Sequence, residues 1–321
     1  MPKSGAIGID VGGTKTLFAL FDDAFELVDQ IKEKTETEKE TFTSNLAAKV
    51  SALLKKADKT GLTVEAIGAG VAGDVHTDKG LVRSAPNLPA LEDFSFKKAL
   101  AKVTDLEVGV YNDVNAALFG EHKFGAAVGY KHVIGVFIGT GIGGALIIGG
   151  KLHLGATGHA GDIGNYLVQP FGPLAGSARH GVLDDIASRT AIAGVAATLA
   201  AKQWAPNLLA EVGTDVQKIK SSALAAAIKA GDDTIEELVR SRAQIVGIVL
   251  SNLVDFLNPE LIVLGGGLTD AMPGLIRDAV DAGIQGHATD NARKAVKVVT
   301  AQLTDQAVTT GAAKLALDLS R

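Results

Sequence analysis

The sequence predicts a mixed α/β protein of two domains, and three observations support that prediction. The chain has 321 residues, about twice the ~150 residues of an average domain. Short apolar runs with strand character alternate with longer segments of helical periodicity, which is the pattern of a sheet covered by helices. A pair of apolar runs joined by a glycine turn opens the chain and recurs after residue 130. We therefore expect a largely covered sheet in each half of the chain.

The first half is predicted to begin with three strands, because three short apolar runs are separated by glycine-rich or acidic turns. A helix is predicted over residues 38–57, where apolar side chains recur on one helical face. Strand and helix then alternate up to a helix that starts near Asp113. The predicted strands are Ala6–Asp10, Thr16–Phe21, Leu27–Lys32, Ala66–Val71 and Val108–Tyr111, with a short helix at Lys97–Val103.

The second half repeats this order of elements. It opens with two apolar runs around a glycine turn, continues through a long helical region and ends with a strand and a helix. No low-complexity linker separates the halves, so we expect them to pack together around a cleft. The predicted elements are strands at Val133–Gly139 and Ala145–Ile148, a helix at Thr234–Leu257, strands at Leu261–Leu264 and Val296–Leu303, and a helix at Gln306–Leu319.

Composition and charge exclude several classes of protein. The chain has no cysteine, which excludes disulfides, thiol nucleophiles and cysteine-ligated zinc. The net charge is only −5 and no basic run is present, which argues against a nucleic-acid partner. The N-terminal segment MPKSGAIGID lacks the pattern of a signal peptide, and we expect a cytoplasmic protein. The uncharged stretch between His132 and Lys151 is rich in glycine, so we predict a buried hairpin there and no membrane span.

The first glycine turn reads DVGGTKT at residues 10–16 and is a candidate phosphate-binding loop. Gly12 and Gly13 leave backbone N–H groups accessible to a ligand. Asp10, at a strand end, is a candidate Mg²⁺ ligand, directly or through water. Thr14 adds a hydroxyl and Lys15 a positive charge. Taken alone, the same residues are equally compatible with an ordinary hairpin turn.

The second glycine turn reads GTGIGG at residues 139–144 and offers similar chemistry without the charge, with Thr140 and Gly141 as candidate phosphate contacts. Such a turn in each half indicates two loops that hold a polyphosphate from opposite sides. A third turn contains Gly265 and Gly266 and follows a predicted strand. It could let an adenine ring lie against bare backbone, or it could be a simple strand-to-helix turn.

Asp113 lies at a predicted strand-to-helix junction, in the segment YNDVN at residues 111–115. Asn and Asp are preferred helix N-caps, which would explain both residues structurally. The functional interpretation, which we favour, makes Asp113 the base that accepts a proton from an attacking hydroxyl. A carboxylate suits phosphoryl transfer, because the transition state is loose and positioning matters more than early proton removal.

Five ordered segments resemble the ROK sugar kinases, a family of the actin/hexokinase/Hsp70 superfamily with bacterial glucokinases among its members. They are similar, in order, to the family's first phosphate loop, its PNLP sugar loop, its catalytic segment, its second phosphate loop with the sugar motif beyond, and its adenosine-binding turn. The resemblance covers nearly the whole chain. The segments are IDVGGTKT, SAPNLPALEDF, YNDVNAALFGE, FIGTGIGGALIIGGKLHLGATGHAGDIG and LNPELIVLGGG.

The resemblance implies two ribonuclease-H-like (actin-like ATPase) α/β domains with an interdomain cleft. It implies domains at residues 1–117 plus 305–321 and at 118–304, ATP and Mg²⁺ as cofactors, a small sugar as substrate, and a homodimer or homotetramer. The aligned positions are Asp113 as catalytic base, Asn87 and Asn112 as sugar contacts, Asp10, Thr14 and Thr140 as magnesium and phosphate contacts, and Gly266 in the adenosine turn.

The sequence departs from the family in the sugar and zinc loops. The four zinc-ligand positions fall on Asn165, Ala175, Ser177 and Val182, so we expect no structural zinc. Two family glutamates that touch the sugar align with Asp162 and Asp184, whose side chains are shorter by roughly 1.5 Å. Asn165 replaces a histidine, and it can hydrogen-bond but carries no charge. Either the loop moves inward and glucose fits, or the pocket prefers another hexose or derivative.

The sequence as a whole predicts an ATP-dependent kinase that phosphorylates a hexose at its 6-hydroxyl, as a glucokinase does. The alternatives are a kinase of mannose, fructose, allose or an N-acetylhexosamine, and a non-catalytic sugar-binding regulator. Repressors of the family carry a helix-turn-helix before the kinase-like core, and the first strand at Ala6 is expected to leave no room for one. A different phosphoryl donor, such as polyphosphate, stays open.

Overall fold

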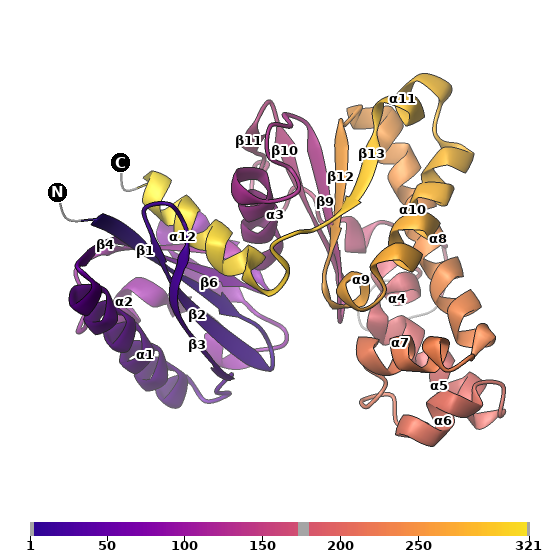
Figure 1. Ribbon diagram of the computed structural model, residues 1–321, viewed down its shortest axis with the longest axis horizontal. Helices are drawn as coiled ribbons and strands as arrows, with labels where there is room; N and C mark the ends of the chain where they lie inside the picture. The colour runs from indigo at the N-terminus through magenta and orange to yellow at the C-terminus, as the bar shows by residue number, and fades with distance from the viewer. Residues whose placement is uncertain (1–2, 173–179, 320–321) are drawn as a thin grey trace. The chain divides into compact units, whose positions relative to one another are not determined.

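The computed structural model describes residues 3–172 and 180–319, and the chain folds into two compact units (Figure 1). The first unit contains the described residues up to Gly129, the segment Leu152–Ala160 and the described residues from Asp305 onward. The second contains Tyr130–Lys151 and the described part of Gly161–Thr304. Each unit has its own sheet and apolar core, which confirms the predicted mixed α/β class.

The first unit is built on a five-stranded sheet in the order β3-β2-β1-β4-β8. The first three strands form an antiparallel meander, and the other two continue the sheet parallel to β1. All five strands predicted for this half are present, each somewhat longer than its apolar run. Their bounds are β1 (Lys3–Val11), β2 (Lys15–Asp22), β3 (Leu27–Lys34), β4 (Leu62–Val71) and β8 (Glu107–Asn112).

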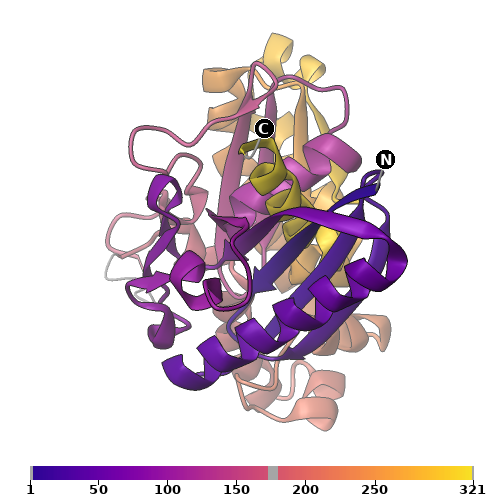
Figure 2. The same cartoon turned by 90° about the vertical axis from the view of Figure 1, so that its left-hand side faces the viewer.

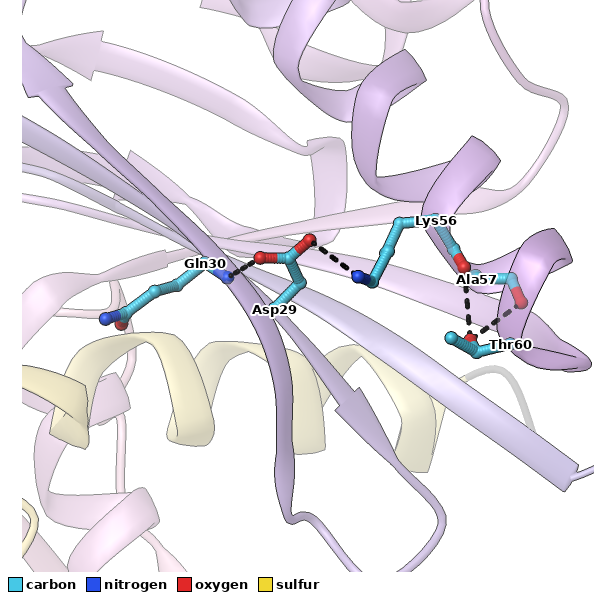
Figure 3. A network of polar contacts seen from close by, with 5 residues as sticks. All are labelled: Asp29, Gln30, Lys56, Ala57 and Thr60. Atoms are coloured by element: carbon cyan, nitrogen blue, oxygen red, sulfur yellow. Dashed lines mark hydrogen bonds and ion pairs between the residues drawn. The ribbon is translucent and has the colours of Figure 1, made fainter.

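One face of this sheet is covered by α1 (Lys39–Thr60), which lies across the strands in Figure 2. The helix ends at Gly61, whose φ of 74° is the left-handed conformation that favours glycine. Lys56 Nζ lies 3.7 Å from Asp29 Oδ2 and so links α1 to β3 (Figure 3). In the last helical turn, the Thr60 hydroxyl donates to the carbonyls of Lys56 and Ala57. These exposed contacts add little energy; the buried apolar face holds the helix.

The opposite face of the sheet is covered by α12 (Ala307–Leu319), which packs on the backbone of β1 and β4 and on α3 (Asp113–Phe124). Gly8 allows this approach, because a Cβ on it would lie 2.6 Å from the Thr309 carbonyl carbon. Gly68 and Gly311 serve the same purpose against α12 and α3. Asp10 follows Gly8 by two residues, so its side chain points to this same face.

A small antiparallel sheet, β5-β6-β7, lies between β4 and β8 in the sequence. Its strands have only two to four residues and no periodic signal, so the sequence did not predict them. The predicted helix at Lys97–Val103 is the shorter α2, capped by the Ser95 hydroxyl. The bounds here are β5 (Asp74–His76), η1 (Thr77–Lys79), β6 (Leu81–Ser84), η2 (Pro89–Leu91), β7 (Phe94–Ser95) and α2 (Phe96–Leu100).

The second unit is built on a sheet in the order β11-β10-β9-β12-β13. β9 (Val133–Ile138) and β10 (Ile142–Ile148) form the predicted hairpin, while β12 (Leu261–Gly265) pairs parallel to β9 and to β13 (Lys297–Thr300). β11 (Lys151–Leu152) lies at the edge. No helix in the part of the chain that the structure describes is long and apolar enough to cross a membrane.

Helices fill most of the second unit between its hairpin and its last strands. The long predicted helix is α8, which packs closely on α10 where Gly247 and Gly283 face each other. The other helices had no predicted bounds: most are too short to show an extended period, whereas the period of α10 at Ile276, Ala279, Val280 and Ile284 was missed. The elements are η3 (Ile163–Asn165), α4 (Leu183–Ala187), α5 (Arg189–Ala201), α6 (Pro206–Val212), α7 (Ser221–Lys229), α8 (Asp233–Leu257), α9 (Gly267–Ala271), α10 (Pro273–His287), α11 (Asp290–Ala295) and η4 (Thr304–Gln306).

Candidate active site

The end of β1 brings Asp10 close to the start of α3. Its partner in the ladder is Gly70 of β4, and a Cβ on Gly70 would lie 3.5 Å from the Cα of Asp113. Glycine is required at this position, because a Cβ there would also overlap the Val308 side chain. Burial, followed by the negative charges of Asp113 and Asp305, raises the pKa of Asp10 to about 7. An isolated carboxyl at a strand end would have no such shift.

Asp113 is the first residue of α3 and follows β8 directly. Burial raises the pKa of its carboxyl, and hydrogen bonds from the backbone amides of Val114 and of Asp113 itself act in the opposite direction. Asp10 and Asp113 are thus two partly buried carboxylates that repel each other. Such an arrangement costs folding free energy and is typical of functional sites.

The first glycine turn joins β1 to β2 and exposes Thr14 and Lys15. Thr35, a buried residue just after β3, holds the turn in place through hydrogen bonds. Its hydroxyl donates to the Gly12 carbonyl at 2.7 Å and lies 2.9 Å from the Thr16 hydroxyl, while its N–H donates to the Thr14 carbonyl at 3.1 Å. The turn is therefore fixed on both of its arms.

The two asparagines predicted to contact sugar lie in different settings within the first unit. Asn87 is exposed beside the first turn, where a Cβ on Gly13 would lie 3.2 Å from its Cβ. Asn112 is the N-cap of α3: its Oδ1 accepts from two helix amides, and its Nδ2 donates to the Gly73 carbonyl at 3.3 Å. One amide hydrogen of Asn112 is left for a ligand, and capping alone accounts for an asparagine here.

The second glycine turn joins β9 to β10, and the α4–α5 segment of the second unit holds it in place. Asp184 Oδ1 accepts from the Ile142 N–H at 2.5 Å, and the Thr190 hydroxyl donates to the Thr140 carbonyl at 2.7 Å. Within residues 3–172 and 180–319, no hydrogen bond engages the N–H groups of Thr140 and Gly141. The tip of the turn therefore offers two backbone donors in a fixed position.

Asp162 and Asn165 lie at the two ends of η3 and bond to each other, with Asn165 Nδ2 donating to Asp162 Oδ2 at 2.7 Å. Both are exposed. Gly164 lets η3 pack on β10, because a Cβ on it would lie 3.3 Å from the Ile142 carbonyl carbon. Burial raises the pKa of Asp184, and the negative charges of neighbouring carboxylates, Asp162 among them, raise it further. The hydrogen bond from the Ile142 amide lowers this pKa. These three polar residues form one electrostatically linked group beside β10.

The third glycine turn connects β12 to α9. Gly266 has a φ of 85°, and a Cβ on it would lie 2.7 Å from the Ile138 amide nitrogen. A Cβ on Gly265 would lie 2.6 Å from the Phe137 ring. Both glycines are thus required by the close approach of this turn to β9. Their presence in the sequence is no evidence for an adenine site by itself.

The region aligned with the zinc loop is closed by backbone pairing. Leu167 and Val182 form an isolated antiparallel bridge, and the Leu183 N–H donates to the Tyr166 carbonyl at 2.9 Å. Val182 is buried in this bridge, and Asn165 is engaged with Asp162 as described above. The other two aligned positions, Ala175 and Ser177, lie outside the described residues.

Three residues whose side chains contact the glycine turns were missed by sequence reasoning: Thr35, Arg189 and Thr190. The sequence indicated Thr35 only weakly, as a threonine that follows a predicted strand without any other candidate site residue. It gave no indication of Arg189, since the Nη2 of this side chain donates to Thr140 Oγ1 at 3.2 Å across 49 positions of sequence. In the first unit the structure brings together Asp10, Asp113 and the ends of β1 and β8. In the second it brings together Thr140, Asp184 and Arg189.

Comparison with known proteins identifies the family. The sequence profile of the ROK family matches residues 6–319. A glucokinase from Streptomyces coelicolor is 32% identical over 313 residues, which cover 97% of this chain and 96% of that protein. An N-acetyl-D-glucosamine kinase from Pasteurella multocida is 29% identical over 269 residues, which cover 82% of this chain and 84% of that protein.

Among solved structures, the crystal structure of a ROK family glucokinase from Streptomyces griseus, in complex with glucose and AMPPNP, superposes with a TM-score of 0.82. The two chains are 32% identical, and the match covers 98% of this chain and 99% of that one. Fold and relatives together define a sugar kinase with the two-domain, actin-like ATPase fold. The chain belongs to the ROK family, as its motifs predicted.

Proposed function

We propose that this kinase transfers the γ-phosphoryl group of ATP to the 6-hydroxyl of a hexose, with glucose as the first candidate. The observation that supports this most directly is the partly buried Asp113, whose carboxyl has a raised pKa and lies beside Asp10. A carboxyl with a raised pKa is a stronger base than an exposed aspartate. The relatives named glucokinases support the choice of glucose.

In the proposed reaction, Asp113 accepts the proton of the sugar hydroxyl as that oxygen bonds to the γ-phosphorus. The bond from the γ-phosphorus to the bridging oxygen breaks, and ADP leaves with that electron pair. Because the transition state is loose, the protein contributes mainly by positioning and by stabilising charge. Asp113 begins a helix and its neighbour Asn112 caps that helix, so the base has little freedom to move.

Asp10 is the residue that fits a magnesium ion. It is an oxygen donor with a raised pKa, which a divalent cation would lower again. The described residues contain no group of three or more histidine, aspartate or glutamate side chains suited to a metal. Mg²⁺ commonly binds through one or two carboxylates, waters and phosphate oxygens, so one partly buried carboxylate is sufficient. When bound, the ion would neutralise charge on the phosphates.

The two exposed glycine turns are the proposed phosphate-binding elements. Gly12, Gly13, Thr14 and Lys15 form one, and their position is supported by the anchor at Thr35. Thr140 and Gly141 form the other, supported by their unengaged N–H groups. We also propose that the nucleoside lies near Gly265 and Gly266, two glycines that also pack closely on β9.

The proposed sugar contacts are Asn87, Asn112, Asp162, Asn165 and Asp184. Asp184 uses one carboxylate oxygen to hold Ile142, so only the other can accept from a sugar hydroxyl. Asp162 and Asn165 are exposed and bonded to each other, and a sugar would have to share that pair. Because these residues differ chemically from the family pattern, we keep an N-acetylhexosamine as a second candidate substrate. The relative named N-acetyl-D-glucosamine kinase supports this candidate.

A coupled ADP-release assay tests the proposal. Glucose, mannose, fructose, allose, N-acetylglucosamine and N-acetylmannosamine are compared as substrates, with and without Mg²⁺. We expect Mg²⁺-dependent ADP release with one of them, and a loss of about 10²–10⁴-fold in kcat for Asp113→Asn with normal folding. Asp105→Asn, an exposed aspartate of the same unit, is the matched control. Wild-type turnover by Asp113→Asn would show that Asp113 is not the base.

We further propose that the chain forms a homodimer or homotetramer, as the family resemblance implies. Sedimentation velocity at micromolar concentration tests this, and a single species of 32.9 kDa would contradict it.

A further inference from the structure

Arg189 is a partly buried cation that has no acidic partner within residues 3–172 and 180–319. It is the first residue of α5, directly after the Ser188 cap. Its Nη1 donates to the Ile219 carbonyl at 3.3 Å, and its Nη2 donates to Thr140 Oγ1 at 3.2 Å. Among the residues that the structure describes, no carboxylate forms an ion pair with it. By contrast, Arg240 and Arg277 of the same unit each pair with a carboxylate at the surface.

Partial burial makes this arrangement unfavourable for the charged side chain. Burial lowers the pKa of the Arg189 guanidinium, and no neighbouring negative charge acts in the opposite direction. A guanidinium has five N–H donors, of which the two described contacts engage two. In the described part of the chain, the other three donors and the positive charge therefore have no protein partner beside the second glycine turn. An anion that binds there would satisfy them.

The surroundings of Arg189 specify which kind of anion fits. Its backbone N–H donates to the Gly139 carbonyl at 3.0 Å, so the same residue fixes the base of the turn whose tip presents the N–H groups of Thr140 and Gly141. Backbone donors and a guanidinium on one loop match the several oxygens of a phosphate chain better than a single carboxylate.

We infer that Arg189 is a phosphate-binding residue of the second glycine turn and contacts the polyphosphate chain of the phosphoryl donor. This inference rests on the proposed function for the identity of the donor. Arg189 contributes a charge-assisted bond that neither Thr140 nor the glycines can supply. It also brings a positive charge to the second turn, whose own six residues carry none and whose other charged contact is the Asp184 carboxylate.

The experiment measures the affinity of the full chain for MgATP, inorganic tripolyphosphate and adenosine. Wild type is compared with Arg189→Met, which keeps an unbranched stem without the charge, and with Arg189→Lys. Arg277→Ala, which removes a remote surface charge from the same unit, is the control. We expect Arg189→Met to bind MgATP and tripolyphosphate about 10- to 100-fold more weakly. Adenosine affinity and the KM for sugar should stay within about twofold, and Arg189→Lys should recover part of the loss.

Several results would overturn the inference. One is unchanged MgATP affinity in Arg189→Met; another is an equal loss for MgATP and adenosine, which would indicate a role in loop structure or base binding. Wild type that binds neither MgATP nor tripolyphosphate would also overturn it. A wild type that phosphorylates no hexose would refute the proposed function alone, because the tripolyphosphate comparison still decides the role of Arg189. If Arg189→Met melts at a much lower temperature than wild type, the same ligand affinities are compared between Arg189→Lys and Arg189→Gln instead.

Discussion

Replacing Gly311 by alanine should destabilise the first unit strongly, although alanine is the better helix former. Gly311 lies in α12 where that helix touches α3. A Cβ on Gly311 would lie 2.6 Å from the carbonyl carbon of Ala116 and 2.8 Å from the amide nitrogen of Gly120, and closer still to the Ala116 carbonyl oxygen. These are backbone atoms, so no side chain can rotate away. The two helices would have to separate by roughly 1 Å to restore van der Waals distances.

The separation has a second consequence, because α12 also packs on the sheet through Gly8 and Gly68. A shift that relieves the clash with α3 therefore disturbs the contacts of α12 with β1 and β4. Overpacking of a core typically costs about 1–3 kcal/mol, and a clash between two backbones lies at or above the upper end. The gain in helix propensity offsets about 1 kcal/mol. We expect a net loss of at least about 2 kcal/mol, or roughly 4–8 °C in Tm.

Gly286→Ala in α10 is the matched control, because a Cβ on Gly286 would meet no heavy atom within 4 Å. The same chemical change in a helix should there stabilise by about 0.5–1 kcal/mol. The assay is urea denaturation followed by far-UV circular dichroism, with Trp204 fluorescence reporting on the second unit. The reasoning is refuted if Gly311→Ala unfolds within 0.5 kcal/mol of wild type, or if both variants are stabilised.

Three further predictions concern the candidate site. The fold raises the pKa of Asp10 to about 7, so the folded protein keeps a proton on Asp10 that the unfolded chain loses above pH ~4. Wild type without Mg²⁺ should therefore lose stability as the pH rises from about 4 to 7. At pH 8, Asp10→Asn should be more stable than wild type by about 1–3 kcal/mol, a value reduced for partial solvent access. Equal melting curves in EDTA at pH 8 would contradict this. Thr35→Val removes the hydroxyl bonded to Gly12 and Thr16, so the KM for ATP should rise about 3- to 10-fold with little change in the KM for sugar. The control Thr43→Val, on the surface of α1, should leave both KM values unchanged. Asp184→Asn keeps an acceptor for Ile142 and should retain more ATP affinity than Asp184→Ala; steady-state kinetics of the two variants would expose the opposite order.

The sequence by itself determined the order of strands and long helices and the positions of the glycine turns. It did so because these are local properties: a strand such as β1 is a short apolar run, and a helix such as α8 has its apolar residues at a fixed period. The family followed from five ordered motifs, and the profile over residues 6–319 confirms it. The short strands β5–β7 and the helices α4 to α7 were not predicted with bounds; most of these elements contain too few residues to show a period.

Only the tertiary structure decided which glycines are required by packing and which are not. Gly266 and Gly311 are required by backbones 128 and 195 positions away, at Ile138 and Ala116. Nothing in the sequence near Gly311 distinguishes it from Gly286, which packing does not require. The same holds for charge: Asp10 has its raised pKa because the fold buries it and brings Asp113 near. Arg189 reaches Thr140 for the same reason. Burial and electrostatic interaction depend on distance in space, which a sequence pattern does not contain.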